Sequence, residues 1–167
     1  MAKYKQAPNS TPPAVTNGSS APKLPAYLFG LLAVIASAVA LWPVLQNSYI
    51  SWDDNVYFYE NDYLTRPLGT AISHFFSGSL YLGAYTPVTL SVLAIISKLA
   101  GSIEPGNFHT AALVLHLINV FLVFLFTHRL AARNTTIAFY SATLFGLHPM
   151  HVESVAWAAE FKDVLFT

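Results

Sequence analysis

The feature that most constrains this chain is an uninterrupted apolar segment near its start. Residues 26–45 contain no charged side chain. About 20 apolar residues are enough for a helix to cross the hydrocarbon core of a bilayer. The segment therefore predicts a membrane span over residues 26–46. Further apolar segments predict two more spans, over residues 108–130 and 135–149.

A cleaved signal peptide is an alternative interpretation of the first apolar segment, because Ala38-Val39-Ala40 matches an A-x-A cleavage pattern. The apolar run continues past this motif to Leu45 and exceeds the usual length of about 7–15 residues, which favours a span. Residues 1–24 are rich in Pro, Ser, Thr and Asn, and this composition predicts a disordered tail.

The composition excludes several classes of protein. Hydrophobic residues make up 54% of the chain and charged residues 10%, against about 45–50% and about 25% in soluble domains. A net charge of zero gives no basic patch for nucleic acid. The absence of cysteine excludes disulfides, thiolate nucleophiles and cysteine metal sites within this sequence. We therefore expect an all-α membrane protein.

The segment at residues 87–100, PVTLSVLAIISKLA, decides the expected topology. Its length is typical of an interfacial or re-entrant helix, although a hydropathy window alone would predict a crossing. If it lies along the surface, all the basic residues that flank spans face the cytoplasm, as the positive-inside rule requires. These residues are Lys3, Lys5, Lys23, Arg129 and Arg133. We favour this arrangement, which makes the N-terminus cytoplasmic and residues 47–107 an external loop.

Two adjacent acidic residues, Asp53 and Asp54, follow the first span. Carboxylates beside hydrocarbon are costly and usually functional. Neighbouring positions on a helix face different ways, so we expect one of the two to point into a pocket. The functional interpretation is a general base or a metal ligand. The alternative is that Asp53 caps a helix over residues 55–59.

Acidic residues recur near the end of the chain. On a continuous helix, Glu153, Trp157 and Glu160 follow i, i+4, i+7 spacing, and Asp163 lies three residues further on. This pattern predicts a second acidic site along one flank, with Lys162 on the opposite side. A solvated external helix face is the alternative.

Histidines flank the end of the third apolar segment. His148 and His151 are separated by three positions, but Pro149 between them predicts a helix break. Imidazole is a common metal ligand, and the spacing matches no standard zinc motif. The alternatives are a metal site and interfacial histidines where a span leaves the membrane.

Polar residues also occur inside the second span. His109, His116, Asn119 and Thr127 fall on one side by helical spacing. Such residues usually hydrogen-bond between helices within a bundle. We therefore expect this stripe to hold helices together and not to form a ligand site.

The order of several motifs resembles that of one family. The motifs are Trp52-Asp53-Asp54-Asn55, Tyr85-Thr86-Pro87-Val88-Thr89, Gly106-Asn107-Phe108-His109, Leu115-His116 and LFGLHPMHVESVAWAAEFKDVL at residues 144–165. They resemble the membrane glycosyltransferases of the GT-C superfamily that carry C-terminal tetratricopeptide repeats, which are similar to O-mannosyltransferases and have many bacterial relatives. The resemblance extends from about residue 51 to residue 167. It identifies the chain as the N-terminal portion of such an enzyme.

The resemblance implies a multi-span helical bundle with interfacial helices in the first external loop. It also implies sugar transfer, on the external face, from a polyprenyl-phosphate-type lipid to a hydroxyl acceptor, most simply on a protein. Asp53 and Asp54 match the acidic motif that supplies the general base. Asp163, with Glu160, matches an acidic residue of the second external region.

One departure concerns the lipid phosphate. Many relatives carry Arg where Phe161 stands, which leaves Lys162 as the nearest cation for a phosphate. His148 and His151 are further candidates to bind the donor phosphate or a divalent metal ion. A divalent metal ion is the expected cofactor. The remaining spans and the repeats lie outside these 167 residues. We therefore expect this chain alone to be inactive.

Two other classes of function stay open. Intramembrane His116 and Asn119, with a re-entrant helix, are typical of a transporter or channel. A non-catalytic membrane assembly subunit is the third possibility. The expected partners are the bilayer, a lipid-linked sugar and a protein or other hydroxyl acceptor, with no nucleic acid. The expected location is the bacterial inner membrane, or the endoplasmic reticulum membrane in a eukaryote.

Overall fold

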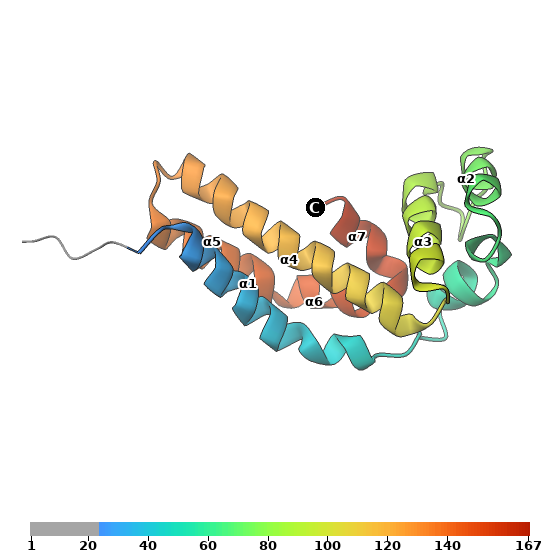
Figure 1. Ribbon diagram of the computed structural model, residues 1–167, viewed down its shortest axis with the longest axis horizontal. Coiled ribbons are helices and arrows are strands. Elements are labelled where there is room, and N and C mark those ends of the chain that lie inside the picture. Colours follow the sequence, from blue (N-terminus) through green and yellow to red (C-terminus); the bar gives the residue numbers. More distant parts are fainter. Residues whose placement is uncertain (1–23) are drawn as a thin grey trace, which may run out of the picture.

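The computed structural model describes residues 24–167, which form an all-helical structure without a β-strand in that range (Figure 1). The tail predicted at residues 1–24 lies, apart from Leu24, outside the described residues. The α-helices are α1 (Tyr27–Leu41), α2 (Leu68–Phe76), α3 (Pro87–Ala100), α4 (Pro105–Leu130), α5 (Thr135–Leu147), α6 (Pro149–Ala156) and α7 (Phe161–Leu165). The shorter 3-10 or π elements are η1 (Trp42–Gln46), η2 (Asn55–Tyr59), η3 (Asp62–Leu64) and η4 (Ala158–Glu160).

Three helices, α1, α4 and α5, lie side by side as a bundle (Figure 1). A shared core of small and aromatic side chains joins them, consisting of Ala33, Val120, Phe124, Ala138 and Ala142. Glycines allow the backbones to approach closely. A Cβ at Gly146 would lie 2.1 Å from Ser37 Oγ, and one at Gly30 would lie 2.8 Å from the Phe124 ring.

Among residues 24–167, two helices are long and apolar enough to cross a membrane, Tyr27–Gln46 and Pro105–Leu130. Both coincide with predicted spans and support a membrane protein. The third predicted span forms as α5, but α5 has 13 residues and is about 20 Å long at 1.5 Å per residue. That length falls short of the hydrocarbon core, which is about 30 Å thick. Two candidate spans in residues 24–167 are fewer than a multi-span bundle needs. A crossing by α5 stays a prediction.

The bundle helices run in directions that bear on the expected topology. Gly30 in α1 packs beside Phe124 in α4, whereas Leu41 packs in one cluster with Leu113. The two helices are therefore antiparallel. The start of α1 and the turn between α4 and α5 lie at the same end of the bundle, away from α2 and α3 (Figure 1). If both helices cross a membrane, the start of α1 and the turn with Arg129 and Arg133 therefore lie on the same side of it, and which side that is stays a prediction.

The predicted interfacial segment forms α3 with the predicted bounds, Pro87–Ala100. Pro87 stands in its first turn, where a missing N–H costs nothing. Gly101 ends it in a left-handed conformation with φ 73°. In Figure 1, α3 is steeply inclined to α4 and packs with α2 at one end of the bundle. The membrane position of α3 stays a prediction.

A second core, which we call the loop cluster, unites the first loop with the C-terminal segment. Its buried side chains come from η2, η3, α2, α3, the start of α4, η4 and α7. They are Tyr57, Phe58, Leu64, Ala71, Phe75, Leu90, Leu93, Ala94, Phe108, Ala112, Ala158, Ala159 and Phe161. The first loop and the C-terminal segment, each of which carries acidic residues, therefore contribute to one core.

Candidate functional site

Asp54 is the link between the two acidic regions. Its side chain is 1% exposed. Oδ2 accepts a hydrogen bond from the backbone N–H of Ile50 at 2.9 Å. Oδ1 accepts one from the backbone N–H of Ala159 at 2.8 Å, across 105 positions of sequence. Hydrogen bonds to a charged group contribute about 1.5–3 kcal/mol each, so this carboxylate anchors the C-terminal segment on the first loop.

Asp53 has a different environment. It is half-buried, and in the described part of the chain its carboxylate makes no hydrogen bond or ion pair. The prediction that Asp53 caps a helix over residues 55–59 is wrong. The position before η2 belongs to Asp54, and no side chain caps that element. The prediction that the two carboxylates face different ways is confirmed, because Asp54 alone is buried.

The continuous helix predicted from Glu153 to Asp163 is also wrong. Helix α6 ends at Ala156, and Trp157 is extended, with φ −109° and ψ 117°. The 3-10 turn η4 and helix α7 follow. The Ala159 N–H, which in a continuous helix would donate to the Val155 carbonyl, donates to Asp54 instead. The acidic residues therefore do not form one stripe.

The members of the predicted second acidic site separate. Glu160 is half-buried and accepts a hydrogen bond from Lys162 at 2.6 Å, so the expectation that Lys162 lies opposite is wrong. Glu153 and Asp163 are exposed. Burial lowers the pKa of Lys162, but the hydrogen bond and charge of Glu160 and the charge of Asp163 outweigh it. The pKa of Lys162 is consequently raised, and the ammonium stays charged.

Two aromatic side chains beside Asp54 were not expected from the sequence to belong to a site. His109 is 1% exposed and lies near Asp54 and the Val155 carbonyl. Within residues 24–167 neither of its ring nitrogens has a hydrogen-bond partner of normal geometry. The motif Phe108-His109 at the start of α4 is the sequence feature that could have indicated His109.

Tyr49 is the other side chain that the sequence reasoning missed. Its hydroxyl donates a hydrogen bond to the Ile103 carbonyl at 2.6 Å. Its ring stacks on Phe58 with the ring centroids 4.5 Å apart. Burial, followed by the nearby Tyr59 hydroxyl and Asp54 carboxylate, raises the pKa of Tyr49. Tyr49 thus ties the residues before Asp54 to the loop that precedes α4.

The predicted break at Pro149 is confirmed, and it gives His148 a structural role. His148 Nδ1 accepts a hydrogen bond from the Met150 N–H at 3.2 Å and caps α6. The His151 ring packs on Phe145, with centroids 4.3 Å apart, and lies 6.2 Å from the His148 ring. Burial and the charge of His148 lower the pKa of His151.

These histidines do not complete a metal site by themselves. From Leu24 to Thr167, no group of three or more His, Cys, Asp or Glu side chains is arranged to hold a metal ion. A metal ion bound only by His148 and His151 would lack a third protein ligand of these types there. A divalent metal ion at these histidines therefore stays a prediction.

Two members of the predicted polar stripe of α4, His116 and Asn119, contact neighbouring helices as predicted. His116 Nε2 lies 3.1 Å from the Gly146 carbonyl of α5. Asn119 Nδ2 donates to the Val164 carbonyl of α7 at 2.8 Å. Both side chains are therefore engaged with neighbouring helices.

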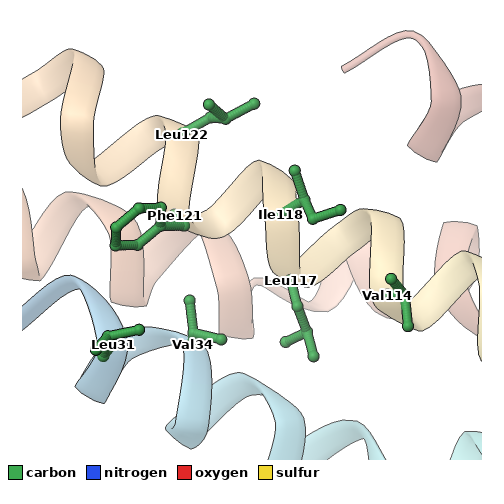
Figure 2. Close-up of a pocket in the computed structure, with 7 residues that line it drawn as sticks. All are labelled: Leu31, Val34, Val114, Leu117, Ile118, Phe121 and Leu122. Atoms are coloured by element: carbon green, nitrogen blue, oxygen red, sulfur yellow. The ribbon is translucent and has the colours of Figure 1, made fainter.

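An apolar groove between α1 and α4 lies apart from the acidic residues. Its volume is about 330 Å³. Figure 2 shows the lining side chains, which are Leu31, Val34, Val114, Leu117, Ile118, Phe121 and Leu122. A groove of this composition along two spanning helices suits hydrocarbon, and it offers no group for polar chemistry.

With this geometry in view, the chain is similar to a class of sugar transferases, the protein O-mannosyl-transferases. Protein O-mannosyl-transferase TMTC1 of Mus musculus is 31% identical over 108 residues, which are 64% of this chain and 10% of that protein. Protein O-mannosyl-transferase Tmtc1 of Drosophila melanogaster is 31% identical over 137 residues, 77% of this chain and 16% of that protein. The human TMTC1 protein is 30% identical over 108 residues, 64% and 11% of the two chains.

The chain thus spans about a tenth to a sixth of the length of these curated relatives. No family model matches it, and no solved structure matches it. The similarity is to proteins that are named as O-mannosyl-transferases. It leaves the donor and the catalytic base to be argued from the residues.

Proposed function

We propose that this chain is the N-terminal portion of a GT-C membrane glycosyltransferase. The full-length enzyme transfers a sugar from a polyprenyl-phosphate-type lipid to a hydroxyl group of a protein on the external face. One carboxylate of the acidic pair acts as the general base. The observation that carries this proposal is the hydrogen bond from Ala159 to Asp54, because it brings the two acidic regions into one assembly.

The chemistry requires a base and a site for the departing phosphate. The acceptor oxygen forms a bond to the anomeric carbon as its proton passes to a carboxylate of Asp53 or Asp54. The bond from the anomeric carbon to the phosphate oxygen breaks, and the lipid phosphate leaves with the electron pair. Lys162, which stays charged, supplies a cation for that phosphate. Residues of the full-length protein outside this chain complete the donor pocket.

The transporter alternative was based on intramembrane His116 and Asn119 together with a re-entrant helix. Both side chains contact backbone carbonyls of neighbouring helices, which favours a structural role for them. The assembly-subunit alternative predicts that neither carboxylate affects sugar transfer. The experiment below distinguishes it from an enzyme.

The test is to replace Asp53 and Asp54 separately with Asn in the full-length protein. Transfer of sugar from a polyprenyl-phosphate sugar to a hydroxyl-bearing peptide is then measured. General-base catalysis contributes about 10²–10⁴-fold, so at least one variant is expected to lose about 10²-fold or more. Asp62→Asn, the same change at an exposed carboxylate of the same loop, is the control. Normal transfer by both variants rejects the catalytic role of the pair.

A further inference from the structure

We propose that the two adjacent carboxylates have separate roles, with Asp54 as a positioning residue that fixes the C-terminal segment and Asp53 as the group that meets the acceptor. This inference rests on the proposed function and deepens it. The bond between Asp54 and Ala159 can be tested without measuring sugar transfer.

Access separates the two residues first. A general base must come within hydrogen-bond reach of the proton that it removes. Asp54 is 1% exposed, and each of its oxygens already accepts a backbone N–H. Asp53 is half-buried, and its carboxylate has no partner among the residues from 24 to 167. An acceptor hydroxyl can therefore approach Asp53, whereas Asp54 is enclosed.

The backbone around Ala159 shows what Asp54 positions. Trp157 is extended and interrupts the helix, and η4 begins at the next residue. Glu160 donates its N–H to the Trp157 carbonyl, whereas the Ala159 N–H goes to Asp54. The Ala159 amide therefore links this turn to the first loop through Asp54.

The turn that Asp54 holds is followed directly by the ion pair of Glu160 and Lys162. Glu160 follows Ala159 directly and binds Lys162 at 2.6 Å. Asp53 precedes Asp54 directly. Because consecutive Cα atoms are about 3.8 Å apart, the Asp54–Ala159 bond fixes Asp53 and the Glu160–Lys162 pair relative to each other. Loss of that bond is expected to move the cation away from the donor phosphate while the base stays in place.

The first experiment measures amide hydrogen exchange in the full-length protein. Asp54→Asn removes an acceptor oxygen and places an NH₂ group against a backbone donor. The remaining oxygen can keep only one of the two donors, so exchange is expected to accelerate about tenfold or more at the Ile50 amide, the Ala159 amide or both. Asp53→Asn and the control Asp62→Asn are expected to leave both amides as in the unmodified protein. Unchanged exchange at both amides in Asp54→Asn overturns the positioning role.

The unmodified protein supplies a check that needs no variant, should Asp54→Asn fail to fold. The Ala159 amide has no backbone acceptor, and Asp54 is its partner. Slow exchange at this amide is therefore expected from the link alone. Rapid exchange there overturns the proposal.

Kinetics then test the division of roles. Asp54→Asn is expected to raise the KM for the polyprenyl-phosphate sugar about tenfold and to change kcat little. Asp53→Asn is expected to lower kcat about 10²-fold or more and to change that KM little. The reverse pattern overturns the division. If the unmodified protein transfers no sugar, the proposed function fails, and the exchange data still decide the structural link independently.

Discussion

The bundle of α1, α4 and α5 and the loop cluster are held together by different means. The bundle relies on close approach of helices at small residues, with Gly146 against Ser37. The loop cluster relies on aromatic packing and on bonds between side chains and distant backbone, such as that from Ala159 to Asp54. Tolerance of added volume should therefore be low in the bundle, and sensitivity to loss of single polar atoms should be concentrated in the loop cluster.

The largest effect is expected from Gly146→Ala in the bundle. The new Cβ would lie 2.1 Å from Ser37 Oγ and 2.9 Å from Val120 Cγ2. Ser37 is held by a hydrogen bond to the Ala33 carbonyl, so the clash requires the helices to shift. Overpacking of this kind costs about 1–3 kcal/mol, measured by thermal unfolding in nanodiscs.

A matched control for this change is Gly69→Ala in α2, where a Cβ would meet nothing within 4 Å. Alanine is favoured over glycine in a helix by up to about 1 kcal/mol. Gly69→Ala is therefore expected to be neutral or stabilising. Equal loss of stability in the two variants would show that close helix approach is not what holds the bundle.

The bundle is also the region that the sequence predicted well. Hydropathy placed the first two spans, and helical spacing identified His116 and Asn119 as contacts between helices. These features depend on neighbours within one helix, so a local pattern reveals them. The third predicted span is shorter than a crossing needs, because α5 ends at Leu147, two residues before Pro149.

The candidate site was predicted only in part, for a physical reason. The acidic pair and the C-terminal motif were found, but the break at Trp157 was not. At that break the Ala159 N–H donates to a carboxylate 105 positions away, and no local periodicity encodes such a contact. Tyr49 and His109 were missed as members of the site for the same reason, because their significance comes from their position beside Asp54.

A smaller effect is expected from Tyr49→Phe in the loop cluster. The change keeps the stack on Phe58 and removes the hydrogen bond to the Ile103 carbonyl, at a cost of about 0.5–1.5 kcal/mol. Tyr140→Phe, at an exposed tyrosine that makes no hydroxyl hydrogen bond within the described range, is the control and should be neutral. Thermal unfolding at pH 8 measures both.

Because the pKa of Tyr49 is raised, we expect the free energy of unfolding to depend on pH in the alkaline range. Burial raises the pKa of Tyr49, so the folded state favours the neutral phenol more than the unfolded state does. The resulting stability is complete below the unfolded pKa of about 10 and is lost as the pH rises from there toward the folded pKa. The stability difference between the unmodified protein and Tyr49→Phe should therefore shrink between pH 9 and pH 11. A constant difference would mean that the hydroxyl is hydrated.

The smallest effect is expected from His151, where the bundle and the C-terminal segment meet. Burial lowers the pKa of His151, and the charge of His148 lowers it further. The His116 ring of α4 lies 5.9 Å away. The unfolded chain therefore binds a proton more readily, and stability should be complete above about pH 6.5 and fall as the pH drops toward the folded pKa.

His151→Phe isolates this contribution, because an aromatic ring can keep the contact with Phe145 without taking up a proton. The unmodified protein is expected to lose more stability than the variant between pH 7.5 and pH 5.5, measured by thermal unfolding at both values. His148→Gln removes the second cause and should reduce the pH dependence less than His151→Phe does, because burial is the larger cause. If all three proteins show the same pH dependence, His151 is solvated, and the junction between the two regions is looser than the packing of α6 on α5 implies.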